Sequence, residues 1–202
     1  MITTLILAKN HEDFISATLD SVKDLGPILV ADLGSNDKTP SVCEKMGAKV
    51  FHTPFNQNYS VVRNNLASKA NTEWLFWLDP GEHVTSGHEL FEAEKSDQMY
   101  RVMILKDDLL MKQTRLFRKG SKFHRRVFES IDPDLSEQTL PIIVTGDTKP
   151  DVQEMVNCLT LWKDEEPISP EPDYYLACLH LMCKRYDQFL ATADQFLFQK
   201  KE

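Results

Sequence analysis

The sequence ILVADLGSNDKT, residues 28–39, decides the fold of this chain. Its first half, up to Leu33, is apolar apart from Asp32 and rich in branched side chains, which predicts a buried β-strand. Its second half contains Gly, Ser, Asn and Asp at positions 34–37, residue types that favour tight turns. Pro40 then suits the first turn of a helix, which we expect to end at Met46, before Gly47. One short stretch thus predicts a strand, a turn and a helix.

The same alternation extends in both directions along the chain. Asn10 offers an N-cap for a helix that continues to Leu25, since apolar residues recur there at helical spacing. Together the patterns predict strands at residues 3–8, 28–33, 48–52 and 74–78, with helices between them at residues 10–25, 40–46 and 60–70. This alternation predicts an α/β fold with a mostly parallel sheet and helices on both faces.

Polar segments follow three of the predicted strands. They span residues 9–12, 34–37 and 79–82. Ligands of such sheets bind beyond the carboxyl ends of the strands. We therefore expect these three segments to converge in one cleft.

The second half of the chain has a different pattern. Further strands are predicted at residues 99–105, 114–117 and 140–144, and six Lys or Arg residues crowd positions 115–126. Residues 147–150 read as a linker, and the segments after it have helical spacing. We therefore predict a domain at residues 1–146 and a helical appendage at residues 150–202.

The composition excludes several classes of protein. The chain has 202 residues, with 23 Lys and Arg against 31 Asp and Glu, so its net charge is −8. An acidic surface repels nucleic acid and anionic lipid, so neither is an expected partner. No apolar run is long enough for a membrane span, and no signal peptide is recognisable. Four cysteines without paired spacing favour buried thiols and a cytoplasmic location.

Several segments resemble family 2 glycosyltransferases, which have the Rossmann-like GT-A fold. Four motifs of that family have counterparts here in the same order, and the last three helices resemble a tetratricopeptide-type hairpin. The counterparts are Lys9-Asn10, Asp32 to Thr39, Arg63-Asn64 with Trp74 to Asp79, and Arg115-Leu116-Phe117-Arg118. The resemblance implies a UDP-sugar as donor, with UDP-glucose as one candidate.

The resemblance also implies roles for individual residues. Asp32 would accept the N–H of the uracil ring, although a carboxylate there also caps turns. Ala8, Lys9 and Asn10 would contact the base, and Glu12 the ribose. Asp79 would contact ribose or a metal. The resemblance also implies that Arg63, Arg115 and Arg118 bind the donor, although an arginine on a helix, such as Arg63, is equally consistent with solvent exposure.

The metal motif of the family is incomplete in this chain. The family usually has a second Asp, a ligand of Mn²⁺ or Mg²⁺, where Gly81 stands, and a His where Phe128 stands. Three outcomes stay open. Asp79 still holds a metal with Glu82, His83 or His124; or the basic run, through Arg115, Arg118, Lys122 and Arg125, neutralises the diphosphate without a metal; or the protein binds nucleotide without catalysis.

If the protein is an enzyme, the resemblance implies an inverting hexosyl transfer by a single displacement. Glu129 is the first candidate for the base that deprotonates the acceptor, and Glu82 is the second. The acceptor is a protein, a glycan or a lipid-linked sugar, and apolar faces on the last helices make a homo-oligomer one expected state. The alternative is a silent nucleotide-sugar-binding or interaction module.

Overall fold

A computed structural model describes residues 1–93, 95, 99–106, 109–127, 129–131, 138–146 and 151–199. The chain divides into two compact units. The first contains residues 1–55, 61–124 and 130–148, and the second contains residues 56–60, 125–129 and 149–202. As a division into domains, the predicted boundaries 1–146 and 150–202 stay a prediction. The predicted linker at residues 147–150 lies outside the described residues.

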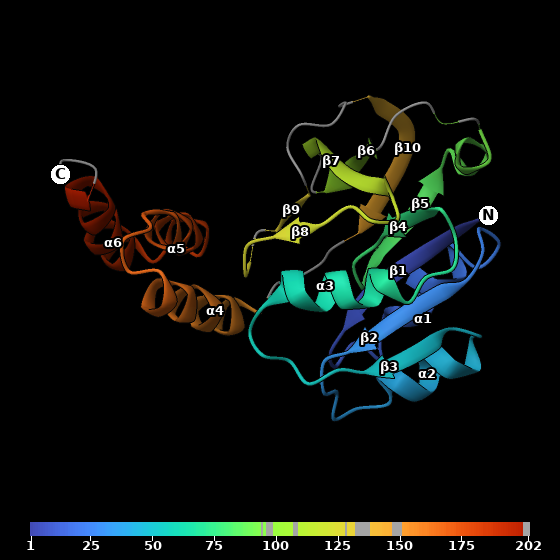
Figure 1. The fold of residues 1–202 in the computed structure, drawn as a ribbon, viewed down its shortest axis with the longest axis horizontal. Coiled ribbons are helices and arrows are strands. Elements are labelled where there is room, and N and C mark those ends of the chain that lie inside the picture. Colours follow the sequence, from blue (N-terminus) through green and yellow to red (C-terminus); the bar gives the residue numbers. More distant parts are fainter. Residues whose placement is uncertain are drawn as a thin grey trace. The chain divides into compact units, whose positions relative to one another are not determined.

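The first unit is built on a mixed sheet of eight strands in the order β3-β2-β1-β4-β7-β6-β10-β5 (Figure 1). Neighbours from β3 to β4 are parallel, whereas β7 is antiparallel to both β4 and β6, and β5 is antiparallel to β10. The strands are β1 (Ile2–Ala8), β2 (Ile28–Asp32), β3 (Lys49–His52), β4 (Trp74–Trp77), β5 (Glu82–Ser86), β6 (Met99–Lys106), β7 (Leu109–Arg118) and β10 (Thr139–Gly146). Two short strands, β8 (Phe123–His124) and β9 (Ser130–Ile131), pair separately.

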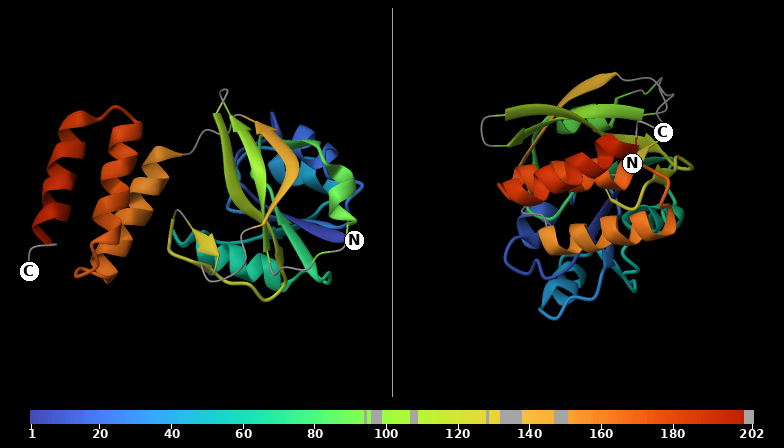
Figure 2. Two further views of the ribbon diagram at one scale, coloured as in Figure 1. Left: turned by 90° about the horizontal axis from the view of Figure 1, so that it is seen from above. Right: turned by 90° about the vertical axis from the view of Figure 1, so that its left-hand side faces the viewer.

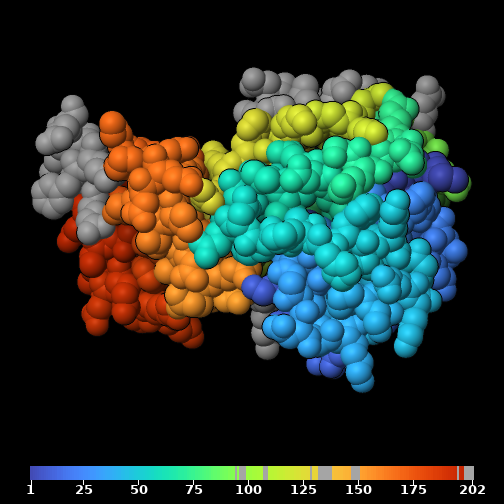
Figure 3. Space-filling view, turned by 60° about the horizontal axis from the view of Figure 1, so that its bottom comes forward, coloured from blue at the N-terminus to red at the C-terminus, as the bar shows by residue number. Residues whose placement is uncertain are grey.

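Helices cover both faces of the parallel half of this sheet, as predicted. Figures 1 and 2 show α3 (Tyr59–Ser68) on one face, with α1 (Ile15–Asp20) and α2 (Thr39–Lys45) on the other. In the space-filling view of Figure 3, α2 and β3 lie side by side at the surface. Every crossover helix predicted in the first 80 residues is therefore present.

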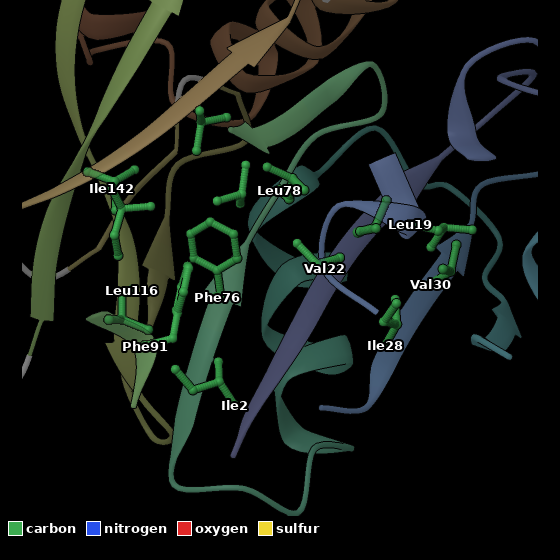
Figure 4. Close-up of a cluster of buried hydrophobic side chains, with 14 of the residues drawn as sticks. Ile2, Leu19, Val22, Ile28, Val30, Phe76, Leu78, Phe91, Leu116 and Ile142 are labelled. Atoms are coloured by element: carbon green, nitrogen blue, oxygen red, sulfur yellow. The ribbon is translucent and has the colours of Figure 1, made fainter. Parts of the chain in front are cut away.

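The core forms because side chains of β1 alternate between the two faces of the sheet. Ile2 packs with Leu19 and Val30 on the face of α1 and α2, and Phe76 joins the same cluster (Figure 4). Ile6 belongs to this cluster as well. These side chains are almost completely buried. The packing fixes the direction of β1, β2 and β4, and so fixes where their carboxyl ends lie.

One prediction about the first unit needs correction, and two elements were missed. The helix expected from Asn10 to Leu25 is the six-residue α1, and Asn10 does not cap it. Strand β5, at Glu82–Ser86, was not predicted, because Glu and His do not form an apolar run. The 3₁₀ helix η1 (His88–Phe91) was also not predicted.

The second unit contains three helices in its described part: α4 (Val152–Glu165), α5 (Glu171–Met182) and α6 (Tyr186–Gln199). The Asp151 side chain caps α4 by accepting the N–H of Glu154. Helix α5 packs against both of its neighbours. The likeness to a tetratricopeptide hairpin stays a prediction.

Two further properties concern the whole chain. Cys43 and Cys158 are buried free thiols, as predicted, whereas Cys178 and Cys183 are only partly buried. In the described part of the chain, every helix is too short or too polar to traverse a bilayer.

Candidate functional site

The loops after β1 and β2 are joined to each other by reciprocal hydrogen bonds. The Asn10 N–H donates to Ser35 Oγ at 3.0 Å, and the Asn36 N–H donates to Asn10 Oδ1 at 2.8 Å. Asn10 has a φ of 58°, a left-handed conformation that Asn tolerates better than most residues. Asn10 therefore links the two loops and leaves the helix uncapped.

A second set of bonds continues the same junction. The Glu12 N–H donates to Asp37 Oδ2 at 3.1 Å, and the Lys38 N–H donates to Glu12 Oε2 at 2.7 Å. The His11 N–H donates to Thr39 Oγ1 at 2.7 Å. Two of the three polar segments predicted to converge are thus joined by hydrogen bonds. We refer to these two loops, residues 9–12 and 34–39, as the rim.

Asp32 stands where this rim meets the sheet. It is the last residue of β2, is paired with Ala8 at the end of β1, and is only 4% exposed. The Ser35 N–H donates to its Oδ1, and His52 Nδ1 lies 3.1 Å from its Oδ2. Burial alone would raise the pKa of Asp32, but the bonds from Ser35 and His52 outweigh it and lower the pKa. Asp32 is therefore an ionised carboxylate at a strand end.

The third segment, residues 79–82, forms a tight turn after β4. The Glu82 N–H donates to the Asp79 carbonyl at 3.0 Å, which closes the turn. Pro80 and Gly81 occupy its centre, and Gly81 has a φ of 89°. Proline followed by a residue of positive φ is typical of a type II turn, which favours glycine at the second position. The turn also brings the start of β5 back to the end of β4.

Arg115 holds the two carboxylates of this turn. Its Nη1–H donates to Asp79 Oδ2 at 3.0 Å, and its Nη2–H donates to Glu82 Oε1 at 2.9 Å. Gln113 Oε1 accepts from the Nε and Nη2 sides of the same guanidinium. The Asp79 N–H donates to Glu82 Oε2 at 2.9 Å. Both oxygens of Glu82 thus accept a hydrogen bond in a buried position.

Arg63 approaches Asp79 from α3. Its guanidinium carbon lies 3.5 Å from the centre of the Trp77 ring, a cation–π geometry, and its Nη2 lies 3.9 Å from Asp79 Oδ1. The Trp77 Nε1–H donates to the same Asp79 oxygen at 2.7 Å. We refer to Arg63, Asp79, Glu82 and Arg115 as the charge cluster.

The two acids of the charge cluster have opposite pKa shifts. Burial would raise the pKa of Asp79, but the charges of Arg115 and Arg63, with the bonds from Trp77 and Arg115, lower it. Burial raises the pKa of Glu82 to about 7, and the nearby Asp79 charge adds to this against the effect of Arg115. Asp79 is therefore the more acidic member of the pair.

His11 lies in the first loop of the rim and is influenced by charges on either side. Its Nδ1 accepts the Lys9 N–H at 3.0 Å. Burial lowers the pKa of His11, while the charges of Asp37 and Asp79 act on the ring in the opposite sense. Strand β1 lies between β2 and β4 and is parallel to both, so the three predicted segments follow strand ends at one edge of the sheet.

The residues of the charge cluster do not fit a divalent metal. A metal of this class needs several available oxygen ligands, but Arg115 and Trp77 already donate to the oxygens of Asp79, and each oxygen of Glu82 already accepts a hydrogen bond. His83 follows Glu82 on β5 and so points to the opposite face, and His124 lies on β8. Phe128 lies outside the described residues.

The other predicted site residues lie elsewhere in the first unit or belong to the second unit. Arg118 pairs with Trp74, at the opposite end of β4 from Asp79, and forms an ion pair with Glu73. The basic run is also divided between the units, since Arg125 bonds to Glu171 within the second unit. Glu129 belongs to the second unit as well, where its charge, after burial, adds to the raised pKa of Cys158. Arg118 and Arg125 are therefore each held by an acid of their own unit.

Sequence reasoning missed several side chains that shape the edge. Trp77 and Gln113 orient the charge cluster, His52 contacts Asp32, and Thr18 Oγ1 accepts the Gly81 N–H at 2.9 Å. A two-residue spacing from Asp79 to Trp77 and from Arg115 to Gln113 places each pair on one side of its strand, and this spacing is visible in the sequence. The contact of Thr18 is long-range and leaves no local pattern.

Comparison with known proteins identifies a family that the first part of the chain resembles. Residues 3–80 match the model of the family described as glycosyl transferase family 2. That range contains all three strand ends and the Asp32 segment. The resemblance inferred from the motifs is thus confirmed.

Curated relatives are similar over two thirds of the chain. A TPR repeat-containing protein of Synechococcus elongatus is 26% identical over 145 residues, which is 66% of this chain and 36% of that protein. An uncharacterized glycosyltransferase of Rickettsia conorii is 23% identical over 149 residues, 68% of this chain and 52% of that protein. The chain therefore spans about a third to a half of the length of these relatives.

The fold also matches a solved structure. The crystal structure of residues 1–349 of Staphylococcus aureus TarS in complex with UDP aligns with a TM-score of 0.59 at 13% identity. The alignment covers 79% of this chain and 64% of that one. This likeness confirms the predicted α/β architecture of the GT-A type.

Proposed function

We propose that this chain is a glycosyltransferase that moves a hexose from a UDP-sugar, with UDP-glucose as one candidate, to an acceptor hydroxyl with inversion. The family match and the GT-A fold support transfer of a sugar. The UDP bound in TarS supports uridine as the base of the donor. Asp32 is the observation that carries the proposal.

Asp32 suits recognition of uracil because of its charge and its position. Uracil offers one N–H donor between two carbonyl groups, and an ionised carboxylate accepts such a donor well. The Asp32 carboxylate is held rigidly by Ser35 at the end of β2, next to Ala8. His52, which covers its other oxygen, has a side chain that is 71% exposed and can move aside. The backbone of residues 8–10 then lies beside the base.

In the proposed reaction, the acceptor oxygen attacks the anomeric carbon while the bond to the diphosphate breaks on the opposite face. The acceptor proton passes to a carboxylate base, and UDP leaves with the bonding electrons. Both oxygens of Glu82 accept hydrogen bonds, which disfavours Glu82 as that base. Glu129, the first candidate from the sequence, belongs to the second unit and stays a prediction.

Calorimetric titration with UDP and CDP tests the role of Asp32. We expect UDP to bind more tightly than CDP, since the ring nitrogen that carries the uracil N–H is an acceptor in cytosine. Asp32→Asn should weaken UDP binding about tenfold or more, as loss of a charge-assisted hydrogen bond does, and should narrow the preference over CDP. Asp20→Asn, an exposed change on α1, is the control. Equal UDP affinity in the wild type and Asp32→Asn would refute the assignment.

The second candidate is a nucleotide-sugar-binding module without turnover. It is favoured by the absence of a carboxylate at Gly81 and by the engaged oxygens of Glu82. An assay for release of UDP from UDP-glucose distinguishes the two candidates. The reaction is run with and without Mn²⁺, and the UDP is measured by chromatography. Binding of UDP without any release of UDP from a sugar donor would favour the module.

A further inference from the structure

The charge cluster contains as many guanidinium groups as carboxyl groups. Asp79 and Glu82 are the acids that follow β4, and Arg115 and Arg63 approach them from β7 and α3. Arg115 is 7% exposed and Glu82 is 5% exposed, so this arrangement lies within the folded unit. A fixed internal cation therefore already faces both acids.

The geometry of Arg115 resembles that of a bridging cation. Two nitrogen atoms of one guanidinium reach oxygens of two different carboxylates, at 3.0 and 2.9 Å. Gln113 accepts from the remaining side and orients the group. A planar guanidinium with five donors is well suited to such contacts. Arg115 consequently supplies to Asp79 and Glu82 the positive charge that a metal held by these two acids would supply.

The backbone of the turn after β4 also disfavours a metal-binding side chain at position 81. Gly81, which stands where a second acid would be expected, adopts a φ of 89° inside the turn. A side chain at this φ is strained. The turn is also held from outside, since Thr18 accepts the Gly81 N–H and a Cβ on Gly146 would lie 2.2 Å from the Gly81 carbonyl oxygen.

We propose that the guanidinium of Arg115, with Arg63 beside it, replaces the divalent cation, so that the diphosphate of the nucleotide is bound without a metal. This inference rests on the proposed function. Cationic side chains can stabilise the negative charge of a diphosphate in a site that excludes water. Arg63 is the more accessible of the two, since its side chain is 14% exposed and stacks on Trp77. Asp79 then positions the two arginines.

Binding of UDP to the full chain in EDTA and in Mn²⁺ tests this proposal by calorimetry. We expect the two affinities to agree within about twofold. Arg115→Met should lower the affinity in EDTA at least tenfold, whereas Lys112→Met, which removes an exposed charge from the same strand, should not. A tenfold or greater gain of wild-type affinity in Mn²⁺ would overturn the proposal.

Binding of Mn²⁺ in the absence of nucleotide, measured by electron paramagnetic resonance, gives a second and independent test. Removal of Arg115 frees the oxygens of Asp79 and Glu82, so Arg115→Met should gain a Mn²⁺ site that the wild type and Lys112→Met lack. A wild-type Mn²⁺ site that Asp79→Asn abolishes would overturn the proposal. If Arg115→Met does not fold, the wild type and Asp79→Asn still decide.

These tests separate this inference from the proposed function. Failure of UDP to bind under either condition would remove the proposed function and leave the Mn²⁺ measurement standing. Tight UDP binding that requires Mn²⁺ would keep the proposed function and remove this inference.

Discussion

Asn10 shows how a single residue can serve a different purpose from the one its local sequence predicts. As a helix cap it would act within its own loop, but its side chain bonds to Asn36, 26 residues away. Its left-handed backbone is what directs the side chain across to the second loop. A local pattern identified Asn10 as important but could not identify its partner.

Substitution of Asn10 should therefore loosen the rim. We expect Asn10→Ala to lower the free energy of unfolding by about 2 kcal/mol, because it loses a capping-type bond and strains a left-handed position. Asn10→Gly should cost roughly half as much, since glycine removes the strain but not the lost bond. Urea denaturation measures both. Equal losses for the two variants would show that backbone strain contributes nothing.

Glu82 should give the first unit a characteristic pH dependence. Its pKa is raised from 4.5 to about 7 in the folded chain, so the folded state binds the extra proton between these values. Stability should then fall as the pH rises through this window, by up to roughly 3 kcal/mol. Asp79, whose pKa is lowered, has the opposite effect, and its contribution is lost only in more acidic solution.

Glu82→Gln isolates this effect. We expect the variant to be about as stable as the wild type at pH 5, where Glu82 is protonated in the folded chain and resembles the amide. Its free energy of unfolding should however change less between pH 5 and pH 8. Urea midpoints at both pH values provide the measurement, and an unchanged slope would contradict the raised pKa of Glu82.

At the scale of elements, prediction succeeded where local pattern determines structure. Strands β1 to β4 are short apolar runs bounded by turn residues, and each was located to within a residue or two. Strand β5 was missed because its burial depends on β10, about 60 residues later. The partners of the basic run could not be located for the same reason, since Glu73 and Glu171 are remote from Arg118 and Arg125 in the sequence.

The conformation of the turn between β4 and β5 bears on whether an acid can be introduced at position 81, where the family usually has one. We expect Gly81→Asp to create no Mn²⁺ site and to destabilise the chain by about 1–2 kcal/mol, because it forces a side chain onto a positive φ. Gly81→Ala should cost a similar amount, and Gly81→Asn less. Thermal unfolding and Mn²⁺ titration of the three variants test this. A Mn²⁺ site gained by Gly81→Asp alone would contradict it.

At the scale of the whole molecule, the division into two units is the feature that the sequence suggested in outline but could not locate in detail. Residues 56–60 and 125–129 belong to the second unit although they lie far before its helices. Tyr59 illustrates the reason, since its hydroxyl donates to Glu154 of α4 at 2.5 Å. Contacts of this kind depend on the folded chain, whereas composition marks only the segment around residues 147–150.

If the two units are separate domains, destabilising one should leave the other largely unaffected. Lys163 Nζ lies 2.6 Å from Asp173 Oδ1, and Asp173 is fully buried, so Lys163→Met leaves an unpaired charge in the second unit. Such changes cost ~3–5 kcal/mol when the lost partner is also buried, and somewhat less for the partly exposed Lys163. The double variant Lys163→Met with Asp173→Leu should recover much of the lost stability.

In calorimetry of the full chain we expect two transitions. Lys163→Met should lower the midpoint temperature of one transition, and Asn10→Ala that of the other. A single transition that both substitutions lower together would show that the chain unfolds as one domain.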